Sequence, residues 1–182
     1  MLNKALFLDR DGVVNVDHGY VYEPEKFEFV DGVFSACKAF VDAGYKLIIV
    51  TNQSGIGRGY YTEADFHALS NWVVAQFAEH DVTVSGIYFC PHHPKKALAE
   101  YLKECHCRKP APGMLLQGID DHHIDSKQSI MVGDKLSDMQ AASNANIATK
   151  VLVRSGQACD ACAIAAADHI CDSLADLPAL LL

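Results

Sequence analysis

A short apolar run near the start of the chain, ending in two carboxylates, constrains the fold more than any other segment. Residues 5–8 (Ala-Leu-Phe-Leu) show no alternation with polar residues, which is typical of a strand buried on both faces of a parallel sheet. Asp9 and Asp11 follow, and since alternate residues of extended backbone point the same way, both can face one pocket while Arg10 faces away. Gly12 then allows a sharp turn. We therefore expect an open α/β fold with this pair at the carboxyl end of a strand, where such sheets bind ligands.

Two carboxylates in one pocket suit phosphoryl transfer. One of them, ionised beside a divalent cation, can attack phosphorus and form an aspartyl-phosphate, while the other protonates the leaving oxygen and later activates water. The alternative is an ordinary surface turn, because an acidic chain contains Asp-x-Asp by chance. The apolar strand before the pair, and Gly12 and Asn15 after it, favour the functional interpretation.

The composition limits the class of protein. A chain of 182 residues, 50% of them hydrophobic, is expected to form one soluble domain over residues 1–182. Its formal net charge of -8 argues against nucleic-acid binding, which needs a basic surface. The N-terminus leaves no room for a signal peptide, and no apolar run approaches the roughly 20 residues that span a membrane. Seven cysteines then favour thiols or metal ligands over disulfides. We expect a cytoplasmic monomer that binds neither nucleic acid nor membrane.

Further buried strands end in polar residues that would meet the carboxylate pair. Residues 46–50 predict a second strand, followed by the loop 51–59, whose hydroxyl, amide and backbone N–H groups can cradle a phosphate. Thr51, at the end of this strand, would lie beside Asp9. The remaining strands are expected at residues 84–89, 129–132 and 150–153, and the helices at residues 32–43, 62–79, 112–119 and near the C-terminus.

The fourth of these strands brings a third carboxylate to the same edge of the sheet. Asp134 is the natural metal partner of Asp9, because Mg2+ takes few protein oxygens and keeps water or substrate oxygens as its other ligands. Ser137 is expected to cap the following helix, and Asp138 to brace the loop. The sequence therefore predicts a Mg2+ site.

A polar and aromatic loop, residues 16–24, comes directly after the first carboxylate pair. A loop in this position lies over the site and can contact the substrate. The residues alone allow a plain connector equally well.

Residues 90–109 form an insert with four metal-binding side chains. Cys90 and His92 are two residues apart, as are Cys105 and Cys107. Three thiolates and one imidazole make a closed tetrahedral set that suits structural zinc and leaves no position for a catalytic water. Either of the other two histidines in the insert could replace His92. The insert has little to bury, so it should be mobile without the metal.

Two cations follow the last of these ligands immediately. Zinc would hold the base of the loop that carries Arg108 and Lys109. A rigidly held Lys109 can offset phosphoryl charge, and Arg108 can grip a second anionic group of the substrate. The alternative, two solvated surface cations, is less favoured because the metal site is adjacent.

The cysteines near the C-terminus do not extend this pattern. Cys159 and Cys162 could be a redox pair or half of a zinc site, but no second pair accompanies them. We expect these two and Cys171 to be incidental or to pack a helix.

This order of motifs resembles the haloacid dehalogenase (HAD) superfamily of Mg2+-dependent phosphatases, whose fold is a Rossmann-like parallel sheet flanked by helices. More closely, the motifs that begin at Asp9 and Thr51, the Cys/His segments with Arg-Lys-Pro, and Gly-Asp-Lys from Gly133 look like heptose bisphosphate phosphatases. The match covers residues 6–154. It implies a small phosphorylated sugar as substrate, in the synthesis of precursors for lipopolysaccharide.

The resemblance also implies roles for individual residues. Asp9 would be the nucleophile and Asp11 the acid and base, and Thr51 and Lys109 would stabilise the phosphoryl group. Mg2+ would be held by Asp9, Asp11 (through its carbonyl) and Asp134, and zinc by Cys90, His92, Cys105 and Cys107. Substrate contacts would come from Asp17, His18, Gly19, Tyr20, Thr51, Asn52, Gln53, Ser54, Arg108, Lys109 and Lys135. Val13 stands where relatives usually carry Thr, so that hydroxyl contact is absent.

Two further expectations concern architecture and substrate. Only 16 residues separate Asn15 from Gly32, so we expect no large cap domain and a comparatively open site. Histidinol-phosphate phosphatases resemble the chain in the same motifs, zinc included, and are the alternative. Histidinol phosphate has a single phosphate, whereas the three cations Arg108, Lys109 and Lys135 favour a substrate with a second anion. A zinc-stabilised binding module without catalysis is the third hypothesis.

Overall fold

The computed structural model describes residues 2–182 and is built on one parallel sheet. Its six strands lie in the order β3-β2-β1-β4-β5-β6, and every neighbouring pair is parallel. Neighbouring parallel strands must be joined by crossover connections, and helices in these connections bury both faces of the sheet. The chain has such a helix between each pair of successive strands. The strands are β1 (Lys4–Leu8), β2 (Tyr45–Asn52), β3 (Val84–Cys90), β4 (Ile130–Gly133), β5 (Thr149–Val153) and β6 (His169–Cys171).

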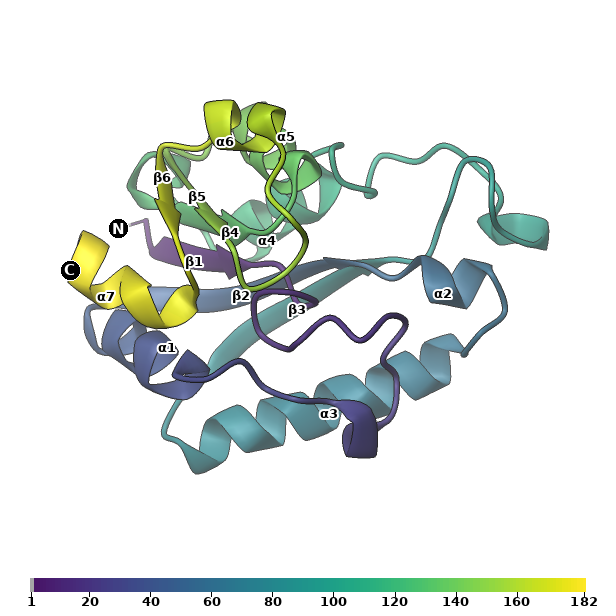
Figure 1. Ribbon diagram of the computed structural model, residues 1–182, viewed down its shortest axis with the longest axis horizontal. Helices are drawn as coiled ribbons and strands as arrows, with labels where there is room; N and C mark the ends of the chain where they lie inside the picture. The colour runs from purple at the N-terminus through teal and green to yellow at the C-terminus, as the bar shows by residue number, and fades with distance from the viewer. Residues whose placement is uncertain (1) are drawn as a thin grey trace.

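The helices form a layer on each face of this sheet. In Figure 1, α1, α3 and α7 lie on one side of the strands and α4, α5 and α6 on the other. The helices are α1 (Val33–Asp42), α2 (Ser54–Gly57), α3 (Glu63–Glu79), α4 (Gly113–Asp121), α5 (Leu136–Asn144), α6 (Ala161–Ala166) and α7 (Leu177–Leu181). Short 3-10 turns are present at Pro24–Lys26, Ala99–Tyr101, Ser126–Gln128 and Leu174–Asp176. The predicted fold class, a Rossmann-like sheet flanked by helices, is confirmed.

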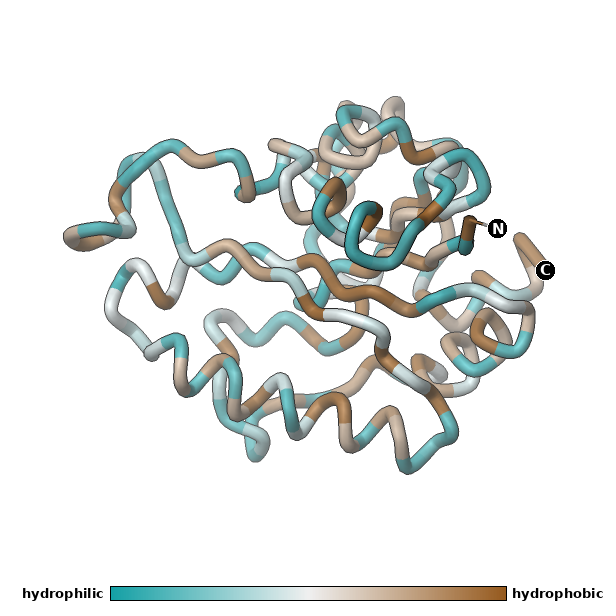
Figure 2. The backbone as a smooth tube through the Cα atoms, turned by 180° about the vertical axis from the view of Figure 1, so that it is seen from behind, coloured by the Kyte–Doolittle hydropathy of each residue, from teal (hydrophilic) through white to brown (hydrophobic). Residues whose placement is uncertain are grey.

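Alternate residues of the central strands fill two separate cores. Leu6 and Leu8 of β1 pack in the core that includes Phe40 of α1, whereas Ala5 and Phe7 pack in the core below α4 and α5. The unbroken apolar run of this strand is therefore needed to bury both faces. The central strands are accordingly the most continuously hydrophobic stretch of backbone in Figure 2.

The strand order determines where a ligand can bind. β1 lies between β2 and β4, so the chain leaves β1 toward one side of the sheet and returns later to the other side. Crossovers in opposite directions from adjacent strands open a crevice at their carboxyl ends. Asp9 follows β1 and Asp134 follows β4, so both face this crevice.

The connection between β1 and α1 is the segment in which a cap domain would be inserted. Between β1 and α1, the described residues contain the 3-10 turn Pro24–Lys26 and no larger folded unit, as predicted. The long connection between β3 and α4 extends away from the body of the molecule in Figure 1. It carries three of the four predicted zinc ligands, and the fourth, Cys90, is the last residue of β3. Within residues 2–182, no helix is both long enough and apolar enough to cross a membrane.

The helix predicted over residues 62–79 is confirmed, and Thr62 caps its start. The Thr62 hydroxyl accepts the backbone N–H of Asp65, and the Asp65 carboxylate accepts the backbone N–H of Thr62. This reciprocal pair satisfies two donors that the first turn of a helix leaves free.

One local prediction is wrong, and two elements were not predicted. Ser137 does not cap α5, which already begins at Leu136. Instead, the Asp138 carboxylate accepts the backbone N–H groups of Asp134 and Lys135. The strand β6 and the helix α6 were also not expected, because a strand of three residues containing His169 and Cys171 is too short and too polar for a periodic pattern.

Candidate active site

Three buried carboxylates converge where β1 and β4 end. The carboxylate oxygens of Asp9, Asp134 and Asp138 lie within 4.8 Å of one another, and each residue is at most 6% exposed. Asp9 and Asp134 were predicted to meet. Asp138 was expected only to brace the loop, and its position on the first turn of α5, four residues after Asp134, could have indicated that it also reaches the cluster.

Lys109 is the buried cation of this cluster. Its Nζ lies 2.9 Å from Asp9 Oδ1 and 2.7 Å from Asp138 Oδ1, and it donates to the carbonyl of Val50 at 2.8 Å. Asn52 holds the backbone of Lys109 from both sides, donating to its carbonyl and accepting its N–H. The end of β2 therefore positions the lysine that follows the zinc insert.

Burial and mutual repulsion determine the protonation of these groups. Burial raises the pKa of Asp9 to about 8, the Lys109 charge opposes this rise, and Asp138 and Asp134 add to it. Burial also raises the pKa of Asp134. Burial would lower the pKa of Lys109, but Asp138 and Asp9 raise it above its usual value, so this residue is a cation. Without a further cation the cluster therefore retains a proton at neutral pH.

Arg10 does not face away from the pocket, contrary to the prediction. Its side chain is buried and its Nη2 lies 2.9 Å from Asp11 Oδ1. The extended alternation stops because β1 ends at Leu8, and the N–H groups of Val13 and Val14 then turn back to the Arg10 carbonyl. Strand periodicity could not place a residue beyond the end of the strand.

Asp11 is held by several donors besides Arg10. Its oxygens accept from Asn15 Nδ2 at 3.0 Å and from Gln53 Nε2 at 3.1 Å. Burial alone would raise the pKa of Asp11, but the Arg10 charge and these hydrogen bonds lower it below its usual value. Asp9 and Asp11 both line a narrow cavity of about 40 Å³, as predicted for the pair. The neighbouring carboxylates of this site therefore have opposite pKa shifts.

A buried tyrosine completes the network behind Asp11. Gln53 Nε2 also donates to Thr51 Oγ1 at 2.8 Å, and Tyr61 donates its hydroxyl hydrogen to Gln53 Oε1. Since the carbonyl end of the Gln53 amide is occupied by Tyr61, its NH2 end is directed at Asp11 and Thr51. Tyr61 was not predicted, because it lies between the loop 51–59 and α3 and belongs to no motif.

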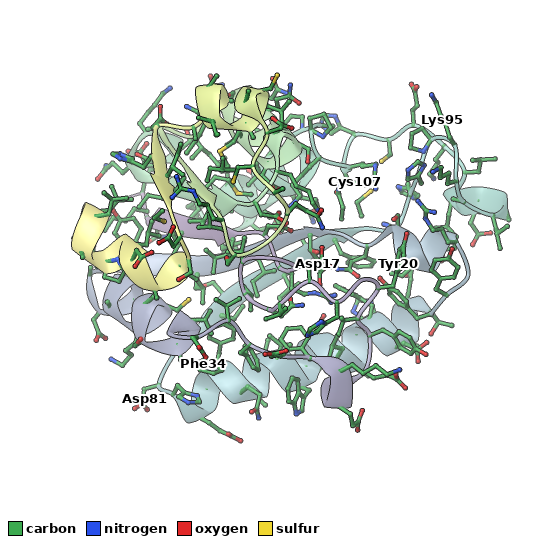
Figure 3. All side chains as sticks on the ribbon, viewed as in Figure 1. Asp17, Tyr20, Phe34, Asp81, Lys95 and Cys107 are labelled. Carbon is green, nitrogen blue, oxygen red and sulfur yellow. The ribbon has the colours of Figure 1, made fainter. Side chains whose placement is uncertain are left out.

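The loop 16–24 lies at the mouth of this crevice, where the sequence allowed either a contact loop or a connector. In Figure 3, Asp17 and Tyr20 lie on the same side of the molecule as Cys107. Tyr20 is 47% exposed, and its ring meets Tyr60 edge-to-face at 4.8 Å. A depression of about 450 Å³ is lined by His18, Gly19, Tyr20 and other residues of this loop, but by none of the clustered carboxylates.

The loop after β5 also reaches the site, which the sequence did not predict. The N–H of Gln157 donates to Asp134 Oδ2 at 2.8 Å, and Gln157 Nε2 lies 3.0 Å from Asp17 Oδ2. A Cβ on Gly156 would come within 2.1 Å of Asp134 Oδ2, so only glycine fits there. The sequence feature that could have indicated this contact is the position of the loop, since it begins at the carboxyl end of the strand beside β4.

The carboxylate cluster fits a divalent cation. Asp134 Oδ1 is buried and has no hydrogen-bond partner, while its neighbours Asp9 and Asp138 share one lysine. An unpartnered buried carboxylate oxygen is costly unless an ion occupies the space beside it. Hard oxygen donors of this kind are the ligands that Mg2+ prefers.

The four predicted zinc ligands lie together at the base of the insert. Cys107 Sγ lies 2.9 Å from Cys90 Sγ and 3.4 Å from both Cys105 Sγ and His92 Nδ1. Around one tetrahedral ion with Zn–S bonds of about 2.3 Å, the donor atoms lie roughly 3.8 Å apart, so these four side chains are grouped closely enough to share one ion after a small outward shift. His93 is directed elsewhere, since its Nδ1 accepts backbone N–H groups of Lys95 and Lys96. The donor set and its spacing fit zinc.

The chain is similar to proteins of one phosphatase family over nearly its whole length. It is 56% identical to the D-glycero-beta-D-manno-heptose-1,7-bisphosphate 7-phosphatase of Salmonella typhi, over 96% of this chain and 93% of that protein. It is 48% identical to the phosphatase of the same name from Vibrio cholerae, over 100% of this chain and 98% of that protein.

A family model and a solved structure agree with these relatives. The model described as HAD-hydrolase-like matches residues 106–177. The D,D-heptose 1,7-bisphosphate phosphatase of B. bronchiseptica, solved with magnesium and phosphate, is 31% identical with a TM-score of 0.83, over 98% of this chain and 97% of that chain. The chain therefore belongs to the HAD-like hydrolases, in the family of the D-glycero-β-D-manno-heptose-1,7-bisphosphate 7-phosphatases.

Proposed function

We propose that the protein removes the 7-phosphate from D-glycero-β-D-manno-heptose 1,7-bisphosphate and releases heptose 1-phosphate, a precursor for nucleotide-activated heptose and lipopolysaccharide core. The observation that carries this proposal is the 56% identity to a phosphatase of that name together with the buried Asp9–Lys109 pair at the carboxyl ends of the strands. The β anomer is the one that the names of the relatives specify.

The proposal includes two metal ions with different tasks. Asp9, Asp134 and the carbonyl of Asp11 would hold Mg2+, and Asp138 lies close enough to join them or to hold Lys109 in place. When bound, Mg2+ supplies positive charge beside the phosphoryl oxygens. The cluster of Cys90, His92, Cys105 and Cys107 would hold a structural zinc.

In the first half of the reaction, Asp9 is the nucleophile. An oxygen of Asp9 attacks the phosphorus of the 7-phosphate, and the bond from phosphorus to the sugar oxygen breaks. Asp11 donates a proton to that oxygen, so the sugar leaves as a neutral alcohol. Lys109 and Thr51 offset the charge of the transferring phosphoryl group.

In the second half, water removes the phosphoryl group from Asp9. Asp11, now a carboxylate, takes a proton from water, which attacks phosphorus and regenerates Asp9 with release of phosphate. The donors from Arg10, Asn15 and Gln53 favour the ionised form of Asp11. This suits the second half, in which Asp11 accepts a proton, and opposes the first half, in which Asp11 must carry one.

The surrounding polar residues are proposed to bind the substrate. Arg108 would grip the second anionic group, and Lys135 would contact the phosphate that is transferred. The other proposed contacts come from Asp17, His18, Gly19, Tyr20, Asn52, Gln53 and Ser54.

We further propose a single domain that acts as a monomer in the cytoplasm. All seven cysteines are free thiols, which suits a reducing compartment. The six strands form one sheet, and the zinc insert leaves and rejoins it between β3 and α4.

The test is phosphate release with Mg2+ from both anomers of the heptose bisphosphate and from histidinol phosphate. We expect the β-bisphosphate to react fastest, and Asp9→Asn to lose at least about a thousandfold in kcat while keeping a native circular dichroism spectrum. Asp81→Asn is the matched control, since this exposed carboxylate lies far from Asp17 in Figure 3 and should not change the rate.

Two outcomes would overturn the proposal. A preference for histidinol phosphate would keep the mechanism and change the substrate, and an active Asp9→Asn variant would exclude Asp9 as nucleophile. The relatives that carry the argument are all heptose bisphosphate phosphatases, so the histidinol phosphate alternative is not favoured.

A further inference from the structure

The loop after β5 is fixed to the site through its backbone and its small residues. Ser155 donates its hydroxyl hydrogen to the carbonyl of Gly12 at 2.8 Å. The N–H of Gln157 donates to Asp134 Oδ2, also at 2.8 Å. Gly156 lies between these two contacts, and a Cβ added at Gly12 would come within 2.8 Å of its Cα. The backbone at Gln157 is therefore held in place without any contribution from its side chain.

The Gln157 side chain extends from this fixed backbone to the loop 16–24. Its Nε2 donates to Asp17 Oδ2 at 3.0 Å, across 140 residues of sequence. The other carboxylate oxygen of Asp17 accepts the N–H of Gly19 at 3.1 Å, so the same side chain also sets the turn that leads to Tyr20. In Figure 1 the loop after β5, in yellow-green, descends beside the loop that follows β1. One carboxylate thus joins the loop after β5 to the residues proposed to contact the substrate.

The tip of the loop 16–24 is attached on both sides of the crevice. Residues 18–20 are exposed. Toward β2, the Tyr20 ring meets Tyr60 edge-to-face at 4.8 Å. Toward β5, Asp17 meets Gln157. Figure 3 shows Asp17 on the side of the loop after β5 and Tyr20 farther toward α2. Loss of the Gln157 contact would therefore free the loop on the side where Asp134 lies.

We infer that Gln157 is a positioning residue, which holds Asp17 and with it the loop 16–24 in the conformation that binds the substrate. This inference rests on the proposed function, in which that loop contacts the substrate. A single exposed hydrogen bond contributes little to the stability of the fold. It acts instead by restricting the loop before the substrate arrives, so that binding does not have to order it. Its loss should raise KM for the sugar bisphosphate and leave kcat nearly unchanged.

The test removes the side chain of Gln157 and leaves its backbone N–H on Asp134. kcat and KM are measured with Mg2+ for heptose 1,7-bisphosphate and for acetyl phosphate, which has no sugar to meet the loop. We expect Gln157→Ala to raise KM for the bisphosphate about fivefold, with little change in kcat and none for acetyl phosphate. In an Asp17→Ala background, Gln157→Ala should have no further effect, because the two residues act through one contact.

A second glutamine supplies the matched control. Gln128 Nε2 donates to Asp125 Oδ2 at 2.8 Å, in the 3-10 turn that precedes β4 at the amino-terminal edge of the sheet. Gln128→Ala removes an exposed hydrogen bond of the same kind and should leave both parameters unchanged.

Hydrogen exchange tests the contact without any sugar. Gln157→Ala should exchange faster at residues 17–20, while β1 and β4 keep the rates of the wild type. If the wild type does not hydrolyse the heptose bisphosphate, the proposed function is wrong, and the exchange rates alone decide whether Gln157 holds the loop. If the wild type hydrolyses it, and Gln157→Ala keeps either its KM or its exchange rates, only the positioning role is refuted. Additive effects of the Asp17 and Gln157 substitutions would refute it as well.

Discussion

At the scale of single residues, the site is defined by an imbalance of buried charge. Asp9, Asp134 and Asp138 surround one buried lysine, Lys109, which contacts two of them. Burying carboxylates without a matching cation is expensive, so some must be protonated or paired with a metal ion. Burial beside two other carboxylates, with Lys109 as the compensating cation, raises the pKa of Asp9 to about 8.

This imbalance predicts that binding of Mg2+ releases a proton. Because the pKa of Asp9 in the folded protein lies above that of a free carboxyl group, the metal-free cluster is protonated below about pH 8 and Mg2+ must displace the proton. Affinity for Mg2+ should therefore rise with pH and level off above that value. Isothermal titration calorimetry in two buffers of different ionisation enthalpy measures the released proton.

Asp9→Asn is the control for the proton release. An asparagine at this position cannot hold the proton, so the variant should bind Mg2+ with less proton release than the wild type. Equal heats in both buffers for the wild type would show that the cluster is already ionised, and would contradict the raised pKa of Asp9.

At the scale of elements, we expect the connection between β3 and α4 to depend on the four proposed zinc ligands, of which Cys90 ends β3 and the other three lie in the connection. Residues 91–112 contain one short turn, Ala99–Tyr101, and expose Leu98 and Leu102. So little apolar burial cannot order a segment of this length. Yet this insert leads directly into Arg108 and Lys109, which the proposed reaction needs in a fixed place.

Removal of zinc should therefore reduce activity through the position of Lys109. We expect a chelator-treated protein to lose about 100-fold in kcat/KM, because a misplacement of about 1 Å is enough for such a loss. Zinc, and not added Mg2+, should restore the activity. Hydrogen exchange should increase in residues 91–107 and stay unchanged in β1 and β4.

A cysteine variant outside the cluster is the matched control. Cys162→Ser should retain the zinc content of the wild type, since Cys162 is exposed and belongs to no ligand group among the described residues. Cys107→Ser should lose it. Full activity of zinc-free protein would contradict the idea that the metal positions Lys109.

The capping box of α3 gives a prediction of a different kind. Thr62→Ala removes the hydroxyl that accepts the Asp65 N–H, and it should lower the free energy of unfolding by about 1 kcal/mol. Urea denaturation followed by circular dichroism measures this loss. The exposed Thr83, which lies in a connection, is the control, and Thr83→Ala should change stability by less than about 0.5 kcal/mol. Equal losses in the two variants would contradict the role of the cap.

At the scale of the whole molecule, the strand order assembles the site from distant segments. Asp9, Asn52, Asp134 and Gln157 follow or end four different strands, yet all lie at one edge because every strand is parallel. Helical layers cover both faces of the sheet, and the site lies at the carboxyl ends of its strands.

Much of this arrangement was predictable because it is local. The runs at residues 5–8, 46–50 and 129–132 identify central strands, since a strand buried on both faces must be apolar at every position. The residue types that follow such strands then indicate the chemistry. Asp9 and Asp134 could be assigned to one edge of the sheet from the parallel class alone.

Other features depended on contacts between segments that no local pattern relates. Arg10 turns back onto Asp11, Asp138 reaches Lys109, and Gln157 bridges to Asp17, 140 residues away in the chain. Each contact requires the strand order and the path of a turn, which the periodicity of the sequence does not contain. Local burial and residue type thus predicted the strands and the chemistry at their ends, whereas the partners of each charged group were decided by how the sheet and loops pack in three dimensions.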